Sequence, residues 1–126
     1  MAAITRKLMH AALATSMMLM GPLATAGTNA LPPIPVDNTL VRNYQCQDGK
    51  SLQVAYYNQH EGQSFARLTV KGKAMLFVDT IAASGVKYVA GPYTWWTKGE
   101  QGDLYDMTAG PDAPPIFAAC TVTPAK

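Results

Sequence analysis

From Leu40 onwards, short apolar segments alternate with turn residues at intervals of about ten positions. This spacing is typical of an all-β meander or barrel of short antiparallel strands, and the region shows no helical period. Eight strands in sequential order can close on themselves, which removes the exposed sheet edges that invite aggregation. The predicted strands span residues 40–47, 51–58, 63–70, 73–78, 86–90, 93–98, 104–108 and 116–122.

Within these strands, the alternation of side chains predicts which face is buried. Leu52, Val54 and Tyr56 alternate with polar or small residues, so one face of their strand is expected inside the barrel. The segment 74–78, AMLFV, is apolar on both faces, which predicts a central position or a place in a closed sheet. Asp48-Gly49 is a strong signal for a two-residue hairpin turn.

The N-terminal segment, residues 1–26, has the pattern of a secretory signal peptide. Two basic residues precede an apolar run over residues 8–23, and a final Ala-Thr-Ala matches a signal-peptidase site. The run is interrupted by polar residues, a glycine and a proline, and falls short of the roughly 20 apolar residues that a membrane-spanning helix needs. We expect cleavage near Ala26, a proline-rich N-terminal arm over residues 27–39, and a single domain over residues 40–126.

The charge of the predicted mature chain limits its partners. Eight basic and eight acidic residues remain after removal of the signal segment, so the mature chain has no net charge. A neutral chain argues against nucleic acid as a partner and against strong electrostatic steering. No cysteine directly follows the apolar run, so the lipid-attachment pattern of bacterial lipoproteins is missing. The sequence predicts a soluble protein of an exported compartment, without a membrane anchor, and it leaves the oligomeric state open.

Two cysteines remain in the mature chain, Cys46 and Cys120. Export places them in a compartment where disulfides persist. A bridge between them closes a loop with a sequence separation of 74 residues and ties the first predicted strand to the last. Such a bridge stabilises a small domain by about 4 kcal/mol in the chain-entropy model.

Residues that could support catalysis or bind a metal are few. His60 is the only histidine of the mature chain and lies in a predicted turn, and the three serines have no base near them in sequence. Asp103 and Asp106 lie three positions apart, so in an extended strand they point to opposite faces and cannot form a paired acid and base. Two cysteines and one histidine do not make a zinc site. We expect a binding protein rather than an enzyme, with no catalytic residue, metal or cofactor.

The most aromatic segment is 93–98, YTWWTK. In an extended strand Trp95 shares a face with Tyr93, whereas Trp96 shares the other face with Lys98. One tryptophan can therefore be in the core. The other either packs on the barrel exterior or under a loop, or belongs to an interface, where aromatic residues are common. The pattern does not decide between these positions, and we take Trp96 as structural.

Two linked motifs occupy residues 84–99, and a third element precedes them. An S-G-x-x-Y element consists of Ser84, Gly85 and Tyr88. A Y-x-x-W-x-K-G element consists of Tyr93, Trp96, Lys98 and Gly99. A Y-x-C-x-D-G element consists of Tyr44, Cys46, Asp48 and Gly49. In these elements, and over roughly residues 40–122, the sequence resembles the bacterial inhibitors of C-type lysozyme known as membrane-bound or periplasmic inhibitors.

This resemblance implies a compact eight-stranded antiparallel barrel with one disulfide, and a proteinaceous inhibitor that protects the bacterial cell wall. C-type lysozyme is then the partner, and the missing lipid-attachment cysteine indicates the non-lipidated, periplasmic branch. In the family, a serine and a lysine enter the lysozyme cleft and meet its two catalytic carboxylates; these roles fall on Ser84 and Lys98. The implied lysozyme-binding set is Ser84, Gly85, Tyr88, Tyr93, Lys98 and Gly99.

Within that set the residues have different expected tasks. Gly85 and Gly99 allow sharp turns beside the two contact residues. Tyr88 and Tyr93 are expected to brace the loops rather than to touch the enzyme. Lys87 lies outside the matched element, and we interpret it as a solvated surface charge.

The residues alone also allow a different class of function. The alternative is an exported β-barrel that binds a small ligand or a glycan in a pocket lined by Tyr93, Trp95 and Trp96.

Overall fold

The computed structural model describes Gly21, Gly27 and residues 33–124. Apart from Gly21, the predicted signal segment and its cleavage site lie outside the described residues. The chain divides at Pro33, and all of the strands belong to the second unit, Pro33–Lys126. Among the described residues, no helix is long and apolar enough to cross a membrane.

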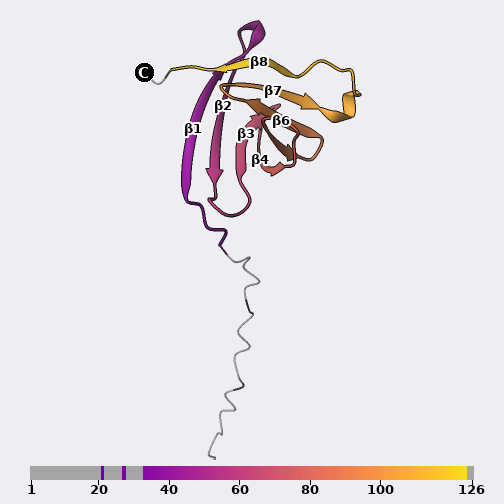
Figure 1. Ribbon diagram of the computed structural model, residues 1–126. Helices are drawn as coiled ribbons and strands as arrows, with labels where there is room; N and C mark the ends of the chain where they lie inside the picture. The colour runs from indigo at the N-terminus through magenta and orange to yellow at the C-terminus, as the bar shows by residue number, and fades with distance from the viewer. Residues whose placement is uncertain (1–20, 22–26, 28–32, 125–126) are drawn as a thin grey trace, which may run out of the picture. The chain divides into compact units, whose positions relative to one another are not determined.

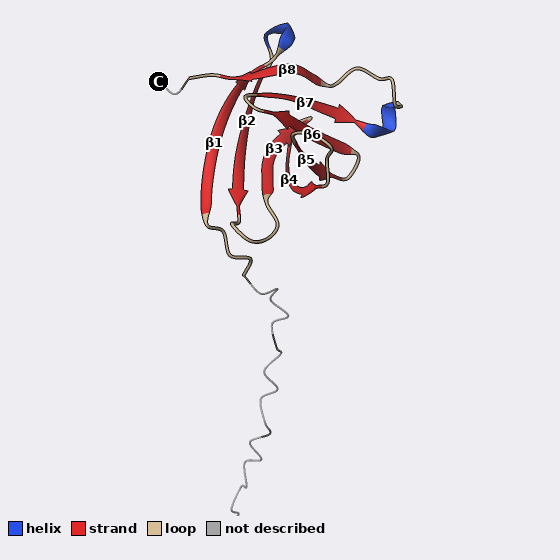
Figure 2. Ribbon diagram, viewed as in Figure 1, coloured by secondary structure: helices blue, strands red, loops and turns tan. Residues whose placement is uncertain are grey.

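The second unit is a closed barrel in which each strand pairs with its sequence neighbour and β1 also pairs with β8, all antiparallel (Figures 1 and 2). The predicted fold class is confirmed. Two short 3-10 turns, η1 (Gln47–Gly49) and η2 (Met107–Ala109), interrupt the sequence of strands. The strands are β1 (Asn38–Gln45), β2 (Ser51–Asn58), β3 (Phe65–Val70), β4 (Lys73–Thr80), β5 (Val86–Ala90), β6 (Tyr93–Lys98), β7 (Gln101–Asp106) and β8 (Phe117–Val122).

The barrel interior follows the predicted alternation. Leu52, Val54 and Tyr56 are all buried, as expected for one face of β2. The Tyr56 hydroxyl lies 2.8 Å from the Tyr44 hydroxyl and accepts a 2.8 Å hydrogen bond from Nε1 of Trp95. Each polar group that these aromatic residues bring into the core therefore has a partner, as buried polar groups require. The remaining buried residues of the cluster are Cys46, Ala66, Leu68, Val70, Phe77, Tyr88, Leu104 and Cys120.

The disulfide matches the sequence expectation, whereas the first hairpin is one residue longer than predicted. Gln45 pairs with Ser51 and the Cys46 amide donates to the Lys50 carbonyl oxygen, so the loop is the three-residue turn Gln47–Gly49 rather than a two-residue turn. Asp48 and Gly49 still supply its positive φ values, 61° and 69°. Cys46, directly after β1, is bonded to Cys120 in β8. The disulfide therefore joins the two strands at which the barrel closes.

The first strand begins earlier than predicted. β1 starts at Asn38, within the segment expected to be a proline-rich arm. The Asp37 amide donates a 3.0 Å hydrogen bond to the Asn58 carbonyl oxygen, and the Gln59 side-chain amide donates to the Pro35 carbonyl oxygen. These bonds attach residues 33–37 to the end of β2. A proline has no N–H to donate, but its carbonyl oxygen can still accept a hydrogen bond, as that of Pro35 does.

β4 lies in a closed sheet, as predicted for residues 74–78, and the outer apolar side chain of Leu76 is 57% exposed. The start of β7 differs from the prediction. β7 begins at Gln101 rather than at residue 104, because the turn before it is limited to Gly99 and Glu100. Gly102, inside β7, lies against the Trp95 ring: a Cβ atom there would meet the ring at 2.5 Å. Gly102, which the predicted strand 104–108 left out, instead makes room for the core tryptophan.

Candidate functional site

The β5–β6 hairpin brings the two predicted contact residues together. Gly91 and Pro92 form its turn, so Ala90 pairs with Tyr93 and Val86 with Thr97. The opposite, open end of the hairpin carries Ser84-Gly85 before β5 and Lys98-Gly99 at the end of β6. Two segments more than ten residues apart in sequence are thus held side by side by a regular ladder.

Gly85 is needed for the close approach of these two segments. Its φ is 65°, a left-handed value that favours glycine. A Cβ atom at this position would lie 2.1 Å from the Thr97 carbonyl oxygen and 2.8 Å from Cγ of Lys98. The loop that carries Ser84 therefore packs directly against the backbone and the aliphatic stem of the lysine. Gly99, with a φ of 59°, begins the turn into β7.

Trp96 connects the two segments from the outer face of the barrel. Its indole Nε1 donates a 2.9 Å hydrogen bond to the main-chain carbonyl oxygen of Ser84. The Lys98 ammonium lies 4.2 Å from the centroid of the Trp96 ring. This distance is within the range of a cation–π contact, in which the ring quadrupole attracts the cation. One side chain thus contacts both predicted binding residues.

Lys87 differs from its sequence interpretation as a solvated surface charge. Its side chain is half-buried, and its ammonium lies 4.1 Å from the centroid of the same Trp96 ring. The cause is strand register, because Lys87 and Trp96 are directly opposed across β5 and β6. Sequence reasoning could have found this contact by counting outward from the Gly91-Pro92 turn.

The groups proposed to contact a partner are accessible. Ser84, Lys98 and Gly99 are exposed. Within residues 33–124 the Lys98 ammonium has no carboxylate partner, since the single ion pair there joins Lys71 and Asp106 at 3.5 Å. Lys98 can therefore bind an external carboxylate without first breaking an internal ion pair.

The two tyrosines of the predicted set lie in different places. Tyr88 is buried inside the barrel, with its ring 5.6 Å from that of Tyr56, and burial raises its pKa. Because Tyr88 is buried, it can support the Ser84 loop only through the barrel interior and not by contact with a partner. Tyr93 lies beside the Gly91-Pro92 turn, at the opposite end of β6 from Lys98, and its ring centroid is 5.6 Å from the Lys71 ammonium. The structure thus separates Tyr93 from the other members of the set.

The alternative ligand pocket is not formed as the sequence suggested. Trp95 has no exposed surface and lies inside the barrel, whereas Trp96 lies on the outer face. Because neighbouring residues of a strand point to opposite faces, the two tryptophans cannot line one pocket. The notion of a shared Tyr93, Trp95 and Trp96 pocket is therefore wrong.

The two aspartates of β7 have structural contacts. Asp103 Oδ1 accepts a 2.7 Å hydrogen bond from the Ala119 amide, where the register of β7 and β8 shifts at a bulge. Asp106 Oδ1 accepts hydrogen bonds from the hydroxyl and the amide of Thr108, which, together with Lys71, lower the pKa of this carboxyl group. No cluster of three metal-ligating side chains occurs in the described part of the chain.

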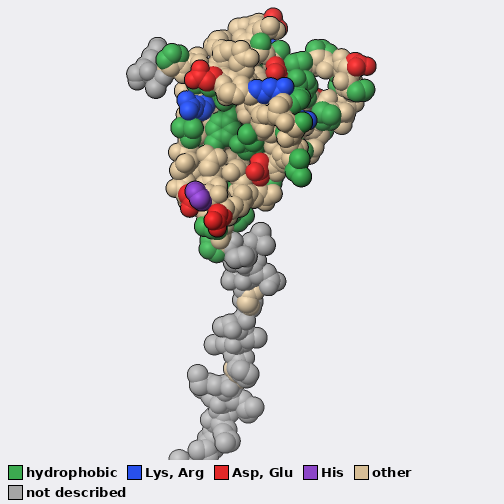
Figure 3. Space-filling model, viewed as in Figure 1, with side chains coloured by type: hydrophobic (Ala, Val, Ile, Leu, Met, Phe, Trp, Pro, Cys, Tyr) green, Lys and Arg blue, Asp and Glu red, His purple; other side chains and the backbone are tan. Residues whose placement is uncertain are grey.

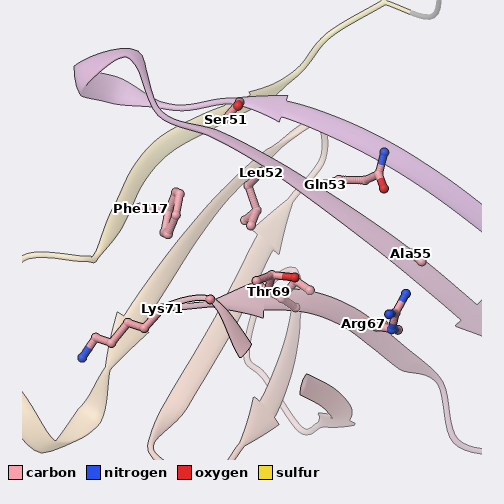
Figure 4. Close-up of a pocket in the computed structure, with 10 residues that line it drawn as sticks. Ser51, Leu52, Gln53, Ala55, Arg67, Thr69, Lys71 and Phe117 are labelled. Atoms are coloured by element: carbon pink, nitrogen blue, oxygen red, sulfur yellow. The ribbon is translucent and has the colours of Figure 1, made fainter. Parts of the chain in front are cut away.

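A hollow of about 540 Å³ lies elsewhere on the barrel, where β2 and β3 separate (Figure 4). The paired register of these strands ends at Ala55 and Arg67. Ser51 and Gln53 on β2 and Thr69 on β3 are among the residues that line it. On the face shown in Figure 3, basic and acidic side chains are interspersed and form no single charged patch. Neither feature involves Ser84 or Lys98.

The fold and the site together define a class of protein: a small disulfide-bonded β-barrel that presents an exposed serine and lysine at the open end of one rigid hairpin. Residues 44–113 match the sequence model of a protein family, which is described as membrane-bound lysozyme-inhibitor of c-type lysozyme (MliC). The match covers more than half of the chain. The chain belongs to this family.

Two curated relatives carry the same name, membrane-bound lysozyme inhibitor of C-type lysozyme. The protein from Cupriavidus necator is 44% identical over 81 residues, which is 64% of this chain and 64% of the relative. The protein from Pseudomonas aeruginosa is 37% identical over 76 residues, 60% of each chain. The chain thus spans less than two thirds of the length of these relatives.

Two solved structures share the barrel. The crystal structure of Pseudomonas aeruginosa MliC in complex with hen egg white lysozyme is 32% identical, with a TM-score of 0.59 over 75% of this chain and 92% of that one. The periplasmic lysozyme inhibitor PliC-St from Salmonella typhimurium has a TM-score of 0.60 over 69% of this chain and 100% of that one. At 24% identity, the second likeness concerns the fold alone.

Proposed function

We propose that this protein inhibits C-type lysozyme by inserting Ser84 and Lys98 into the active-site cleft of the enzyme. Its family membership and the solved complex of a relative with hen egg white lysozyme support this function. The observation that carries the site is the packing of the Ser84-Gly85 loop against the Lys98 stem at the open end of the β5–β6 hairpin. Both contact residues are exposed there.

Lys98 is suited to the ionised catalytic carboxylate of lysozyme. A C-type lysozyme uses one protonated and one ionised carboxyl group on either side of the scissile glycosidic bond. An ammonium within hydrogen-bond distance of the ionised group forms a charge-assisted contact in a partly desolvated cleft. Lys98 has no competing carboxylate within residues 33–124, so its full charge is available for this contact.

Ser84 is suited to the second carboxyl group. Its main-chain carbonyl oxygen accepts a hydrogen bond from the Trp96 indole, which fixes the loop. The Ser84 hydroxyl takes no part in this bond, and the residue is exposed, so the hydroxyl is available to a partner. A hydroxyl can donate to an ionised carboxylate or accept from a protonated carboxyl group. Together, the serine and the lysine would occupy the catalytic pair and block the sugar-binding subsites around it.

The compartment follows from the same function. We place the mature chain in the periplasm, after removal of residues 1–26, where it would meet lysozyme that attacks the cell wall. The relatives are named as membrane-bound or periplasmic inhibitors, which supports a location in the envelope. The neutral mature chain implies that affinity depends on local complementarity rather than on long-range attraction to a basic enzyme.

A turbidity assay tests this function. Hen egg white lysozyme is added to a suspension of bacterial cell walls, with and without a several-fold molar excess of the mature protein. We expect the loss of turbidity to slow strongly when the protein is present. Lys98→Met should restore lysis, and Lys73→Met, which removes another exposed lysine from the start of β4, should not. Full lysis in the presence of the unmodified protein would contradict the proposal.

A further inference from the structure

We propose that Trp96 is a positioning residue that holds Ser84 and Lys98 in their binding arrangement before a partner arrives. This inference deepens the proposed function and rests on it for its effect on lysozyme. Trp96 lies outside the set of contact residues expected from the sequence, where it was interpreted only as structural. The structure instead gives its indole a contact with each of the two elements of the site.

The first contact orders the Ser84 loop. Nε1 of Trp96 has one proton to donate, and the structure directs it to the Ser84 carbonyl oxygen at 2.9 Å. That carbonyl group precedes Gly85, whose left-handed backbone brings the loop against Thr97 and Lys98. Without the indole donor, the loop would depend on the packing of Gly85 and on the β5–β6 ladder that begins at Val86.

The second contact restrains the Lys98 side chain. Lysine has a flexible four-carbon stem, and ordering that stem on binding reduces affinity. With the ammonium 4.2 Å from the indole centroid, much of this ordering is present in the free protein. Restraint before binding is the general way in which preorganisation raises affinity without adding a contact.

The second lysine on the same ring strengthens this interpretation. The ammonium groups of Lys87 and Lys98 lie 4.1 and 4.2 Å from one centroid, so they are at most about 8 Å apart. Two like charges at this separation repel each other in the absence of the ring. The indole offsets that repulsion and keeps both cations at the hairpin, where a carboxylate-lined cleft would attract them.

The first arm of the test uses the free protein, without lysozyme. In proton NMR spectra of the unmodified protein, the methylene protons next to the ammonium groups of Lys87 and Lys98 should be shifted upfield by the ring current of Trp96. The indole N–H proton of Trp96 should exchange slowly with solvent. Trp96→Leu should abolish both lysine shifts. Lysine signals at ordinary positions in the unmodified protein would overturn the inference, whatever the outcome with lysozyme.

The second arm measures inhibition of hen egg white lysozyme. Trp96→Leu should weaken inhibition about tenfold, because one hydrogen bond and one cation–π contact are lost together. Trp96→Phe keeps a ring for the lysines but loses the N–H donor, so it should recover part of the loss. Tyr57→Leu, an aromatic residue on the outer face of β2, is the matched control and should change inhibition less than twofold.

A double variant separates positioning from direct contact with the enzyme. If Trp96 acts through Lys98, then Trp96→Leu should cost clearly less in a Lys98→Met background than in the unmodified protein. An equal loss in both backgrounds would mean that the indole itself contacts lysozyme, and would overturn the inference. If the unmodified protein does not inhibit lysozyme at all, the proposed function fails, while the NMR arm still decides whether Trp96 orders the lysines.

Discussion

Trp95 and Trp96 are neighbours on β6, yet they belong to two regions of the molecule with different tasks. Trp95 lies inside the barrel, donates to the Tyr56 hydroxyl, and meets the Tyr44 ring edge-on with the centroids 5.1 Å apart. Trp96 lies on the outer face and donates to the backbone of the Ser84 loop. Each indole N–H is satisfied, but one fixes the core and the other fixes a binding loop.

The two faces of one strand can thus separate stability from recognition. The inner face of β6 meets the aromatic hydrogen-bond network that fills the barrel. The outer face meets two lysines and the loop that the hairpin presents. Substitutions inside should therefore change the free energy of unfolding, whereas substitutions outside should change affinity for lysozyme and leave the fold intact.

The largest effect is expected from Trp95→Ala. This change removes a fully buried side chain and leaves the Tyr56 hydroxyl without its indole donor. It should reduce the free energy of unfolding by about 3–5 kcal/mol, as for other buried tryptophans. Urea denaturation followed by circular dichroism measures this change. Trp96→Ala, measured in parallel, should reduce the free energy of unfolding by less than half as much. Equal reductions would show that the outer face of β6 contributes to stability as much as the inner face.

Alkaline pH should weaken the inner region. Burial raises the pKa of Tyr44, Tyr56 and Tyr88 above 10.0, and the hydrogen bond with Tyr44 raises the pKa of Tyr56 further. Unfolded tyrosines ionise near pH 10, while the folded ones stay protonated, so stability is present below pH 10 and is lost above it. The loss approaches about 1.4 kcal/mol per pH unit for each such tyrosine.

Urea unfolding between pH 9 and pH 11 measures this slope. Tyr56→Phe should reduce the pH dependence, because one buried phenol is removed. Tyr57→Phe removes a phenol from the outer face of the same strand and should leave the slope as it was. A slope that falls equally in both variants would show that the buried network is not the source of the alkaline effect.

Gly85→Ala tests the backbone contact that joins the two binding segments. A Cβ atom would clash with the Thr97 carbonyl oxygen and with the Lys98 stem, so the Ser84 loop must move. We expect at least about tenfold weaker inhibition, or about 1.4 kcal/mol. Gly72→Ala is the matched control, because its φ of 79° is also left-handed but a Cβ atom there meets nothing within 4 Å. Equal effects on inhibition would show that backbone strain, and not the clash, is responsible.

The smallest effect is expected from Lys87→Met. Lys87 shares the ring with Lys98 but lies farther from the exposed hairpin end, so its charge should act mainly on the rate of association. We expect inhibition to weaken by less than about 1 kcal/mol, with a difference that shrinks as salt is added. Stopped-flow association rates at low and high salt measure it. A salt-independent loss would point to a direct contact instead.

The sequence predicted the barrel because each of its strands is short, alternating and bounded by turn residues. It could not decide between Trp95 and Trp96, because both faces of β6 carry one tryptophan and one threonine, and alternation fixes parity without fixing which side is inside. The role of Gly102 was missed for a related reason. A glycine in sequence suggests a turn, and only the packed core shows that it makes room for the Trp95 ring.

The candidate site was predictable to a similar extent. The motif indicated Ser84, Gly85, Lys98 and Gly99, and the hairpin brings these residues to one end. It also included Tyr93, which the structure places at the other end of β6, because a motif lists positions along the chain and not distances between them. Lys87 was assigned to solvent because alternation along one strand does not show cross-strand contacts; the register counted outward from the Gly91-Pro92 turn places it opposite Trp96.

The most direct test of the proposed mechanism is a double-mutant cycle across the complex. Dissociation constants are measured for the unmodified protein and for Lys98→Met, each against hen egg white lysozyme and against a lysozyme variant with its catalytic aspartate replaced by asparagine. If Lys98 meets that carboxylate, the two changes should be coupled by at least about 1.5 kcal/mol. Additive effects, with coupling below about 0.5 kcal/mol, would contradict insertion of Lys98 at the catalytic pair.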